Sequence, residues 1–370
     1  MATAKKIKVS AIVCATNTGL GIQGKSACDH LGITSPMVVD ISEYNGAEQH
    51  PEWYPNGYFV KGLQLDDEIR TFIDGQDMDI IFITESAYSF YLYDYAHYRG
   101  KKVVSQPNFE FFDWISNPQL PHPDAFISPS MWHYEDTQKY CDDNGLLHTY
   151  LHCPVDRKQF PFRKITQAKT FIHSAGRSAA HDRAGTYSVI EATKHIKSDV
   201  KVIIHFQGEQ GLAHQLTSTT QDYLDYAENF GDMTKLVFLF QNFRNASDIY
   251  KLGDVYVQPR RYGGNNLPMG EALSSGLPMI STAISPNADF LPAKWLVPAY
   301  LKDTFTPRTV IDIYEADVKA LAEKIDEFAN QSEFSMELDN AWADLLADSI
   351  SWETMLPKYQ QFFEEVVNNK

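Results

Sequence analysis

The sequence predicts an α/β protein with two domains, each built around a parallel β-sheet. Short apolar runs of the kind found in buried strands alternate with helical segments along both halves of the 370-residue chain. The alternation stops once, at the mixed, proline-containing stretch 150–164, and then starts again. A chain of this length is sufficient for two domains of ordinary size.

The elements are expected in alternating order. Strands are expected at 7–16, 37–41, 58–60, 79–84, 101–106, 124–128, 169–176, 235–243, 255–257 and 279–281, with a strand and turn at 201–209. Helices are expected at 17–32, 66–73, 86–100, 129–145, 187–196, 212–231, 269–275 and 317–330, and in the last 28 residues, which we expect to divide near Pro357.

Composition restricts the classes of partner. The net charge is −16, with −9 in residues 1–160 and −7 in the remainder, and this disfavours an extended nucleic-acid surface, because such binding depends on neutralising phosphates. There is no signal peptide, no run of 18 apolar residues and no polybasic amphipathic helix, so we expect a cytoplasmic protein without a membrane partner. The four cysteines lack metal-ligand spacing and fit a reducing compartment.

The stretch 254–287 carries the most information about function. An apolar strand leads into a glycine-rich turn, and the turn opens a helix that contains one carboxylate, Glu271, and ends at Gly276. Backbone N–H groups at such a helix N-terminus favour phosphate. Glu271 would accept hydrogen bonds from a diol such as a ribose. An ordinary βαβ unit with an exposed glutamate accounts for the same pattern.

This stretch resembles the donor-site signature of family-4-type retaining glycosyltransferases of the GT-B fold. The residues in step with that signature are Gly264, Leu267, Glu271, Ala272, Gly276 and Pro278. The signature usually has a first glutamate eight residues before the second, and here that place is Gly263. The form PRRYGGN-x-LP-x-x-EAL is similar to glycosyltransferases of bacteriophage genomes.

The resemblance implies an architecture. Two Rossmann-like domains would face a cleft, with an acceptor domain at 1–155 and a nucleotide-sugar donor domain at 156–349. The last helix, at about 350–370, would cross back onto the first domain. Enzymes of this fold do not need a metal, so the resemblance implies no cofactor and a nucleotide-diphosphate sugar, preferably a UDP-sugar, as co-substrate.

The turn from Gly19 to Ser26 fits three interpretations. Gly19-x-Gly21-x-x-Gly24 matches the dinucleotide fingerprint, with Asp40 as the ribose-binding acid of an NAD-binding protein. The same residues followed by Lys25 and Ser26 match the phosphate-binding loop of a P-loop NTPase. One stretch cannot serve both mechanisms. The third interpretation, implied by the resemblance, is a loop facing the donor phosphates through Gly19, Leu20 and Gly21.

Two groups of polar residues complete the predicted site. Glu85, Asn108 and Glu110 follow strand ends in the first half, where the resemblance places the acceptor; solvated loop carboxylates are the alternative. Asp77 and Asp79 resemble an Asp-x-Asp metal motif, but they precede a strand, at the end where α/β sheets do not bind ligands, so no metal site is expected.

In the second half, the basic pair Arg177 and Arg183 stands beside a strand-to-helix turn and suits a diphosphate leaving group, because guanidinium groups bind phosphate oxygens in bidentate fashion. The resembling family has a lysine near Arg183, at a spacing one residue shorter. The resemblance assigns donor contacts to Asn242, Gly264, Asn265, Asn266 and Leu267 and catalysis to Arg177, Arg183 and Glu271.

The function expected from these features is transfer of a sugar from a nucleotide-diphosphate sugar to an acceptor hydroxyl. Retention of anomeric configuration is implied by the resemblance alone. The phage-like signature suggests a hydroxymethylated pyrimidine of phage DNA as acceptor, whereas the charge of −16 opposes DNA and favours a small molecule or a glycan. A non-catalytic binding protein is a further alternative, because the first glutamate is missing.

Overall fold

The computed structural model describes residues 7–85, 88–176, 180–207 and 218–369. The chain forms two compact units. The first consists of Met1–Cys153, Pro307–Thr309 and Trp352–Lys370, and the second of Pro154–Thr306 and Val310–Ser351.

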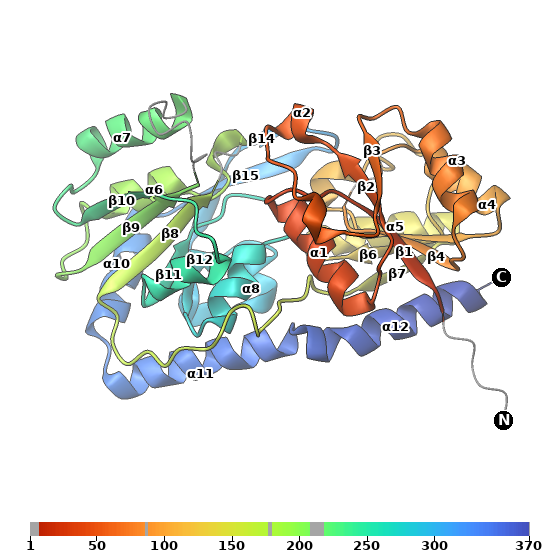
Figure 1. Cartoon of the computed structure of the whole chain (residues 1–370). Helices are drawn as coiled ribbons and strands as arrows, with labels where there is room; N and C mark the ends of the chain where they lie inside the picture. The colour runs from red at the N-terminus through yellow and green to blue at the C-terminus, as the bar shows by residue number, and fades with distance from the viewer. Residues whose placement is uncertain (1–6, 86–87, 177–179, 208–217, 370) are drawn as a thin grey trace. The chain divides into compact units, whose positions relative to one another are not determined.

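The first unit is a doubly wound α/β unit (Figure 1). Within the described residues its sheet has seven strands in the order β3-β2-β1-β4-β5-β6-β7, all paired in parallel. The strands are β1 (Val9–Val13), β2 (Met37–Asp40), β3 (Tyr58–Lys61), β4 (Ile80–Ile83), β5 (Lys102–Ser105), β6 (Ala125–Ser128) and β7 (Leu147–Tyr150). The helices are α1 (Gly19–Leu31), α2 (Ser42–Asn45), α3 (Asp66–Gly75), α4 (Tyr91–Tyr98), α5 (Tyr134–Asn144) and α12 (Trp352–Asn368), with short 3₁₀ turns η1 (Pro51–Trp53) and η2 (Phe109–Phe111).

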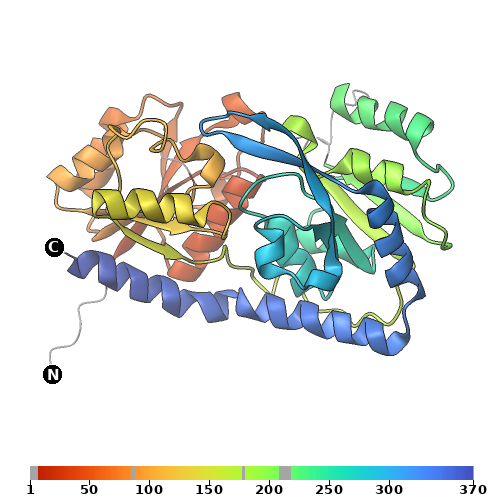
Figure 2. The same ribbon diagram turned by 180° about the vertical axis from the view of Figure 1, so that it is seen from behind.

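Helices cover both faces of this sheet because alternate side chains of each strand point to opposite faces. On β6, Ala125 and Ile127 pack into a core shared with α1 and α12. Phe126, between them, stacks edge-on against Trp114 and against Tyr140 of α5. α1 lies in front of the sheet in Figure 1, and α5 lies in front of it in Figure 2.

The chain returns to the first unit through its last helix, α12. Its buried side chains recur at helical spacing and pack on β4, β5 and β6: Trp352, Met355, Tyr359, Phe362, Phe363 and Val366. We expected the C-terminal helices to divide near Pro357, and this was wrong. The break lies between α11 and α12, at Ile350–Ser351, and Pro357 lies in the second turn of α12, where its missing N–H removes only one helical hydrogen bond.

The second unit repeats the doubly wound arrangement. Its described residues form a parallel sheet of six strands in the order β10-β9-β8-β11-β12-β13. The strands are β8 (Thr170–Gly176), β9 (Lys201–Phe206), β10 (Leu236–Phe240), β11 (Val255–Gln258), β12 (Met279–Thr282) and β13 (Leu296–Val297). The helices are α6 (Thr186–Ala192), α7 (Ser218–Phe230), α8 (Leu267–Ser274), α9 (Asn287–Phe290), α10 (Val318–Asn330) and α11 (Glu333–Ser349), with 3₁₀ turns η3 (Ala180–Asp182), η4 (Ala246–Lys251) and η5 (Ala293–Trp295).

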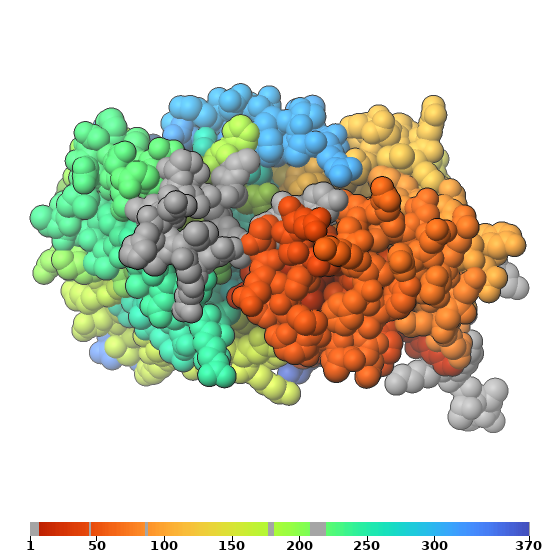
Figure 3. Space-filling view, turned by 45° about the horizontal axis from the view of Figure 1, so that its top comes forward, coloured from red at the N-terminus to blue at the C-terminus, as the bar shows by residue number. Residues whose placement is uncertain are grey.

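An antiparallel hairpin follows the second sheet and was not predicted. It consists of β14 (Ala299–Phe305) and β15 (Ile311–Ala316), and it lies at the surface in the blue part of Figure 3. Its tip, Pro307–Thr309, belongs to the first unit. There Arg308 Nη1 donates to both carboxylate oxygens of Asp113, at 3.0 and 2.9 Å, and Thr309 Oγ1 donates to the Phe109 carbonyl at 2.9 Å. The first unit is therefore assembled from three separate stretches of chain.

None of the helices in the described part of the chain is both long enough and apolar enough to cross a membrane. All four cysteines are buried free thiols.

The anchoring of α12 predicts a difference between two tryptophans. Trp352 is 3% exposed, donates from Nε1 to Ser26 Oγ at 2.7 Å and stacks on His30 at 4.7 Å, whereas Trp342 on α11 is 46% exposed. We expect Trp352→Ala to destabilise the protein by about 3–5 kcal/mol and Trp342→Ala by less than about 1 kcal/mol. Calorimetric unfolding of both variants measures this, and equal shifts in the two melting temperatures would contradict the packing of α12.

Candidate active site

The candidate site of the second unit lies where its strand order reverses. β8 and β11 are neighbours in the sheet, but β8 continues through α6 to β9 on one side and β11 continues through α8 to β12 on the other. The connections after β8 and β11 therefore leave the carboxyl ends of these strands in opposite directions, at a switch point of the kind where α/β sheets bind ligands. The described parts of the two loops, 180–185 and 259–266, contain Arg183 and the predicted glycine-rich turn.

Hydrogen bonds and a close backbone approach hold the two loops together. Arg261 N–H donates to the Arg183 carbonyl at 2.9 Å, and Arg261 Nη1 donates to the His181 carbonyl at 2.6 Å. Gly185 has φ +77°, and a Cβ there would lie 2.2 Å from the carbonyl oxygen of Pro259. Only glycine permits this approach, so the loop after β8 is held against the loop after β11.

A buried histidine fixes the strands beneath these loops. His173 on β8 is fully buried, with Nδ1 2.7 Å from the Val257 carbonyl of β11 and Nε2 3.0 Å from Thr186 Oγ1 of α6. Burial lowers its pKa to about 4, so the imidazole is neutral. Nδ1 then carries the proton donated to Val257, and Nε2 accepts from the Thr186 hydroxyl. His173 is therefore a structural residue.

An aspartate that sequence reasoning missed caps the helix beside the cations. The carboxylate of Asp182 accepts from the N–H groups of Thr186 and Tyr187, at 2.9 and 3.1 Å, and from the hydroxyl of Tyr223 at 2.7 Å. Burial raises its pKa. Asp182 adopts the left-handed conformation, φ 50°. The sequence contained a signal for this cap. Asp182 lies four residues before Thr186, the first residue of α6, and carboxylates are favoured near a helix N-terminus.

The predicted cations have different positions in the structure. Arg177 lies outside the described residues. Arg183 is partly exposed, and its guanidinium carbon lies 5.0 Å from the ring centroid of Tyr262, in the loop after β11. Stacking on an aromatic face holds a guanidinium in place while its N–H edge can still bind oxygen atoms.

The structure explains why Gly263 replaces the glutamate of the resembling signature. Gly263 has φ +105°, and a Cβ at this position would lie 2.5 Å from Nη2 of Arg260. Arg260 is 5% exposed, and its Nε donates to the Tyr262 carbonyl at 2.8 Å. The backbone conformation at 263 favours glycine, and a side chain there would require the buried Arg260 guanidinium to move.

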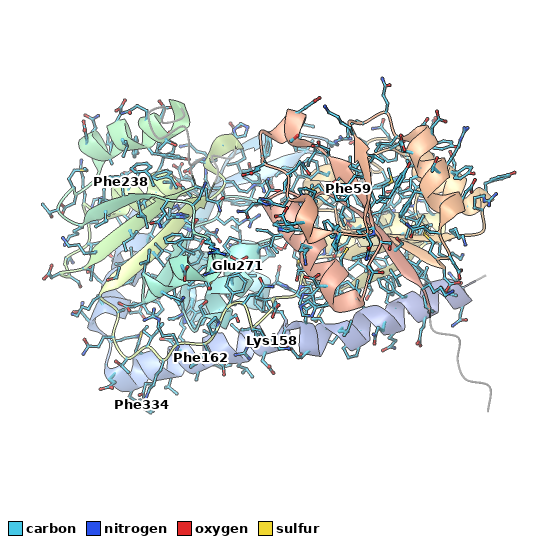
Figure 4. The ribbon with its side chains drawn as sticks, in the orientation of Figure 1. Phe59, Lys158, Phe162, Phe238, Glu271 and Phe334 are labelled. Atoms are coloured by element: carbon cyan, nitrogen blue, oxygen red, sulfur yellow. The ribbon has the colours of Figure 1, made fainter. Side chains whose placement is uncertain are left out.

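Glu271, labelled in Figure 4, lies on α8. Tyr250 of η4 donates its hydroxyl to Glu271 Oε2 at 2.6 Å. Although the residue keeps some solvent exposure, the surrounding protein atoms raise the pKa of its carboxyl to about 7, and the Tyr250 hydrogen bond opposes this rise. The carboxyl therefore titrates near neutral pH.

The four residues of the predicted glycine-rich turn lie at the start of the same helix. Gly264 and Asn265 belong to the loop after β11, Asn266 is the N-cap residue of α8, and Leu267 is its first residue. Asn242 lies in the loop after β10 and is partly exposed. The neighbouring Gln241 carbonyl accepts from His205 Nε2 at 2.7 Å, which ties this loop to β9.

The pKa of Glu271 predicts a pH dependence of stability. Below about pH 4.5 the carboxyl is protonated in the folded and unfolded chains, and above about pH 7 it is ionised in both. Between these values only the folded chain holds the proton, so the free energy of unfolding falls as the pH rises. Relative to the Glu271→Gln variant, we expect the free energy of unfolding of wild type to fall by up to about 3 kcal/mol between pH 5 and pH 8.

Denaturant unfolding at several pH values measures this difference. Tyr250→Phe removes the hydrogen bond that favours the ionised carboxylate and should extend the fall in stability to higher pH. Identical pH profiles for wild type and Glu271→Gln would show that the carboxyl ionises normally in the folded protein.

In the first unit the strand order reverses between β1 and β4. The loop after β1 contains Thr16 and Thr18, whose hydroxyls lie 2.9 Å apart, and Thr18 is the N-cap of α1. The loop after β4 contains Glu85, and Asn108, after β5, donates from Nδ2 to Glu85 Oε1 at 3.1 Å. Glu110 is 2% exposed in η2. The structure thus pairs two of the three acceptor-side residues and buries the third.

The P-loop and dinucleotide interpretations of Gly19–Ser26 do not fit the structure. Both need a glycine-rich loop that cradles phosphate, but α1 begins at Gly19, so Gly19, Leu20 and Gly21 form its first turn. Lys25 pairs with Asp29 one turn further along the helix. The carboxylate of Asp40, the supposed ribose ligand, accepts from Ser42 N–H and Oγ at 2.9 and 2.6 Å.

Gly21 has a packing role that predicts a mutational result. A Cβ at Gly21 would lie 2.0 Å from the Thr16 carbonyl oxygen, whereas a Cβ at Gly75, at the end of α3, meets no atom within 4 Å. We expect Gly21→Ala to destabilise the protein by about 2 kcal/mol or more and Gly75→Ala to change stability by less than about 1 kcal/mol. Thermal unfolding checks both, and a stable Gly21→Ala protein would contradict the close approach of α1 to Thr16.

No metal site was assigned from the sequence, and within the described ranges no group of three or more His, Cys, Asp and Glu side chains could hold a metal ion. Asp79 Oδ2 accepts from Lys8 N–H at 2.9 Å, and Asp77 pairs with the Lys8 ammonium, both beside the amino end of β4. These carboxylates lie at the opposite end of the strand from Glu85.

Comparison with known proteins identifies the fold of the chain. No protein-family model and no curated protein sequence matches the chain. Solved structures do match it. They include sucrose-phosphate synthase from Thermosynechococcus elongatus (TM-score 0.68, 12% identity, 98% of this chain and 100% of that chain) and a glycosyltransferase from Rickettsia africae (TM-score 0.68, 13% identity, 99% and 100%). HepE from Anabaena, solved with UDP and glucose, also matches (TM-score 0.69, 10% identity, 97% and 100%). The chain therefore has the GT-B fold, which confirms the predicted fold class.

Proposed function

We propose that this protein is a glycosyltransferase that moves a sugar from a nucleoside-diphosphate sugar to an acceptor hydroxyl. The observation that carries the proposal is the meeting of two loops where β8 and β11 diverge. One loop brings the guanidinium of Arg183, and the other opens α8, which carries Glu271. A cation, a helix N-terminus and a carboxylate are the groups that bind a diphosphate and a ribose.

Each group of the second unit has a role in this proposal. Glu271 accepts hydrogen bonds from the ribose, and the loop at 264–267 presents backbone N–H groups to the sugar and phosphates. Asn242 lies near the base. Arg177 and Arg183 stabilise the negative charge on the departing diphosphate, which is the largest contribution to catalysis. UDP is favoured as the nucleotide because HepE, of the same fold, was solved with UDP and glucose.

The first unit supplies the acceptor side. The acceptor oxygen forms a bond to the anomeric carbon as the bond from that carbon to the diphosphate breaks, and the hydroxyl proton must leave. Glu85, Asn108 and Glu110 are the groups placed at strand ends for acceptor contact and proton handling. Retention of configuration is part of the proposal and is supported by the sequence resemblance alone.

The acceptor is proposed on the same basis. The phage-like form of the loop after β11 suggests a hydroxymethylated pyrimidine in DNA, whereas the net charge of −16 favours a glycan or a small molecule. An acidic protein binds DNA only through a local basic surface, so DNA transfer by this protein would be strongly salt-dependent.

Calorimetry tests the donor site. We expect wild type to bind UDP or GDP and to give no binding heat with ATP or NAD. Glu271→Ala and Arg177→Ala should each reduce turnover about 100-fold or more, because groups of this kind act on transition-state charge and orientation. Lys25→Ala is the control and should leave turnover unchanged, since Lys25 pairs with Asp29 on α1.

The outcomes separate the alternatives. Tight ATP binding that is lost in Lys25→Ala would support a P-loop protein instead, and UDP-sugar binding without transfer or hydrolysis would indicate a binding protein. Normal turnover in both site variants would refute the site assignment. Incubation of sugar nucleotides with hydroxymethylated DNA, unmodified DNA and glycans, followed by mass spectrometry, identifies the acceptor.

A further inference from the structure

The carboxamide of Asn266 stands out among the buried polar groups of the second unit. Asn266 is 3% exposed, and among the residues that the structure describes neither its Oδ1 nor its Nδ2 has a hydrogen-bond partner. Asn340, equally buried in the same unit, donates to the carbonyls of Arg163 and Gly276, at 3.0 and 2.5 Å. Buried polar groups are normally paired, so a carboxamide with both atoms unpaired points to a ligand that completes it.

The local sequence explains why the helix does not use this side chain. Asn266 is the N-cap of α8, where an asparagine oxygen ordinarily accepts from the N–H of the second or third helical residue. The second residue here is Pro268, which has no N–H. The third, Met269, donates its N–H to the backbone carbonyl of Asn266 at 3.0 Å. The side chain is therefore not consumed by capping.

The chemistry of the carboxamide selects a class of ligand group. It presents one acceptor and one donor side by side and carries no charge. A phosphate or carboxylate would use only the donor and leave Oδ1 unpaired. A trans acetamido group presents its N–H and C=O on opposite sides, so it cannot engage both atoms. Two adjacent hydroxyl groups can, because one donates to Oδ1 while its neighbour accepts from Nδ2.

We propose that Asn266 determines sugar specificity by binding two adjacent hydroxyl groups of the donor sugar through its carboxamide. This inference rests on the proposed function. The position suits it, since Asn266 begins the helix that carries Glu271 and follows the loop whose Gly263 lacks a side chain. A carboxylate at 263 would only accept hydrogen bonds, whereas the carboxamide at 266 both donates and accepts.

The test separates sugar binding from nucleotide binding. Calorimetry with UDP-glucose, UDP-galactose and UDP-xylose selects the sugar nucleotide that wild type binds most tightly, and UDP alone serves as the reference. We expect Asn266→Asp and Asn266→Ala to weaken binding of that sugar nucleotide about tenfold or more while the affinity for UDP changes less than about twofold. Asn266→Asp keeps the shape of the side chain, so it isolates the loss of the donor.

A substrate-side measurement covers the case in which a variant does not fold. Wild type should lose about the same affinity for analogues in which one of the two hydroxyls is replaced by hydrogen, and folded Asn266 variants should not distinguish these analogues from the parent. If UDP binding weakens as much as sugar-nucleotide binding, Asn266 is a structural residue and the inference is wrong. If no analogue or variant changes affinity, the carboxamide holds only water. Failure of wild type to bind any UDP compound would instead refute the proposed function.

Discussion

The reversal of strand order between β8 and β11 is the constraint on which the candidate site depends. Neighbouring parallel strands normally send their connections over the sheet in one direction, and the two loops would then cover the strand ends. Here the connections run in opposite directions, and the loop before α6 and the loop before α8 meet at the carboxyl ends of the two strands. The same reversal between β1 and β4 brings the loop containing Thr16 and Thr18 to the edge where Glu85 stands.

Buried polar groups fix the positions of the loops after β8 and β11. The neutral imidazole of His173 joins β8, β11 and α6, and the carboxylate of Asp182 takes the first N–H groups of α6. Asp182 therefore satisfies the N-terminus of α6 from within the protein. Two glycines also contribute to this geometry. The missing side chain at Gly185 leaves room for the Pro259 carbonyl, and the missing side chain at Gly263 leaves room for the Arg260 guanidinium. These groups hold the loops in place before any ligand binds.

The sequence predicted most strands and helices of both units because buried parallel strands are short apolar runs and the helices between them are amphipathic. It failed where a tertiary contact overrides the local pattern. Pro357 reads as a helix break, yet six buried side chains hold α12 against the first sheet. The glycines at 19–24 read as a phosphate loop, yet Gly21 allows a helix to approach the Thr16 carbonyl. In the β14–β15 hairpin, exposed large side chains such as Tyr300 and Leu301 stand next to each other on β14 and obscure the alternation typical of a strand.

What the sequence determined by itself is which residue types stand at the candidate site. Arg183, Glu271 and the glycine-rich turn can be named from the sequence because charge and backbone freedom are properties of single residues, whereas the roles expected of them come from the resemblance to glycosyltransferases. What only the tertiary structure decided is the environment of each group. The raised pKa of Glu271, the guanidinium of Arg260 beside Gly263 and the unpaired carboxamide of Asn266 depend on burial and on neighbours distant in the chain. Burial and distant neighbours arise when the strands pair, and for that reason local sequence cannot specify them.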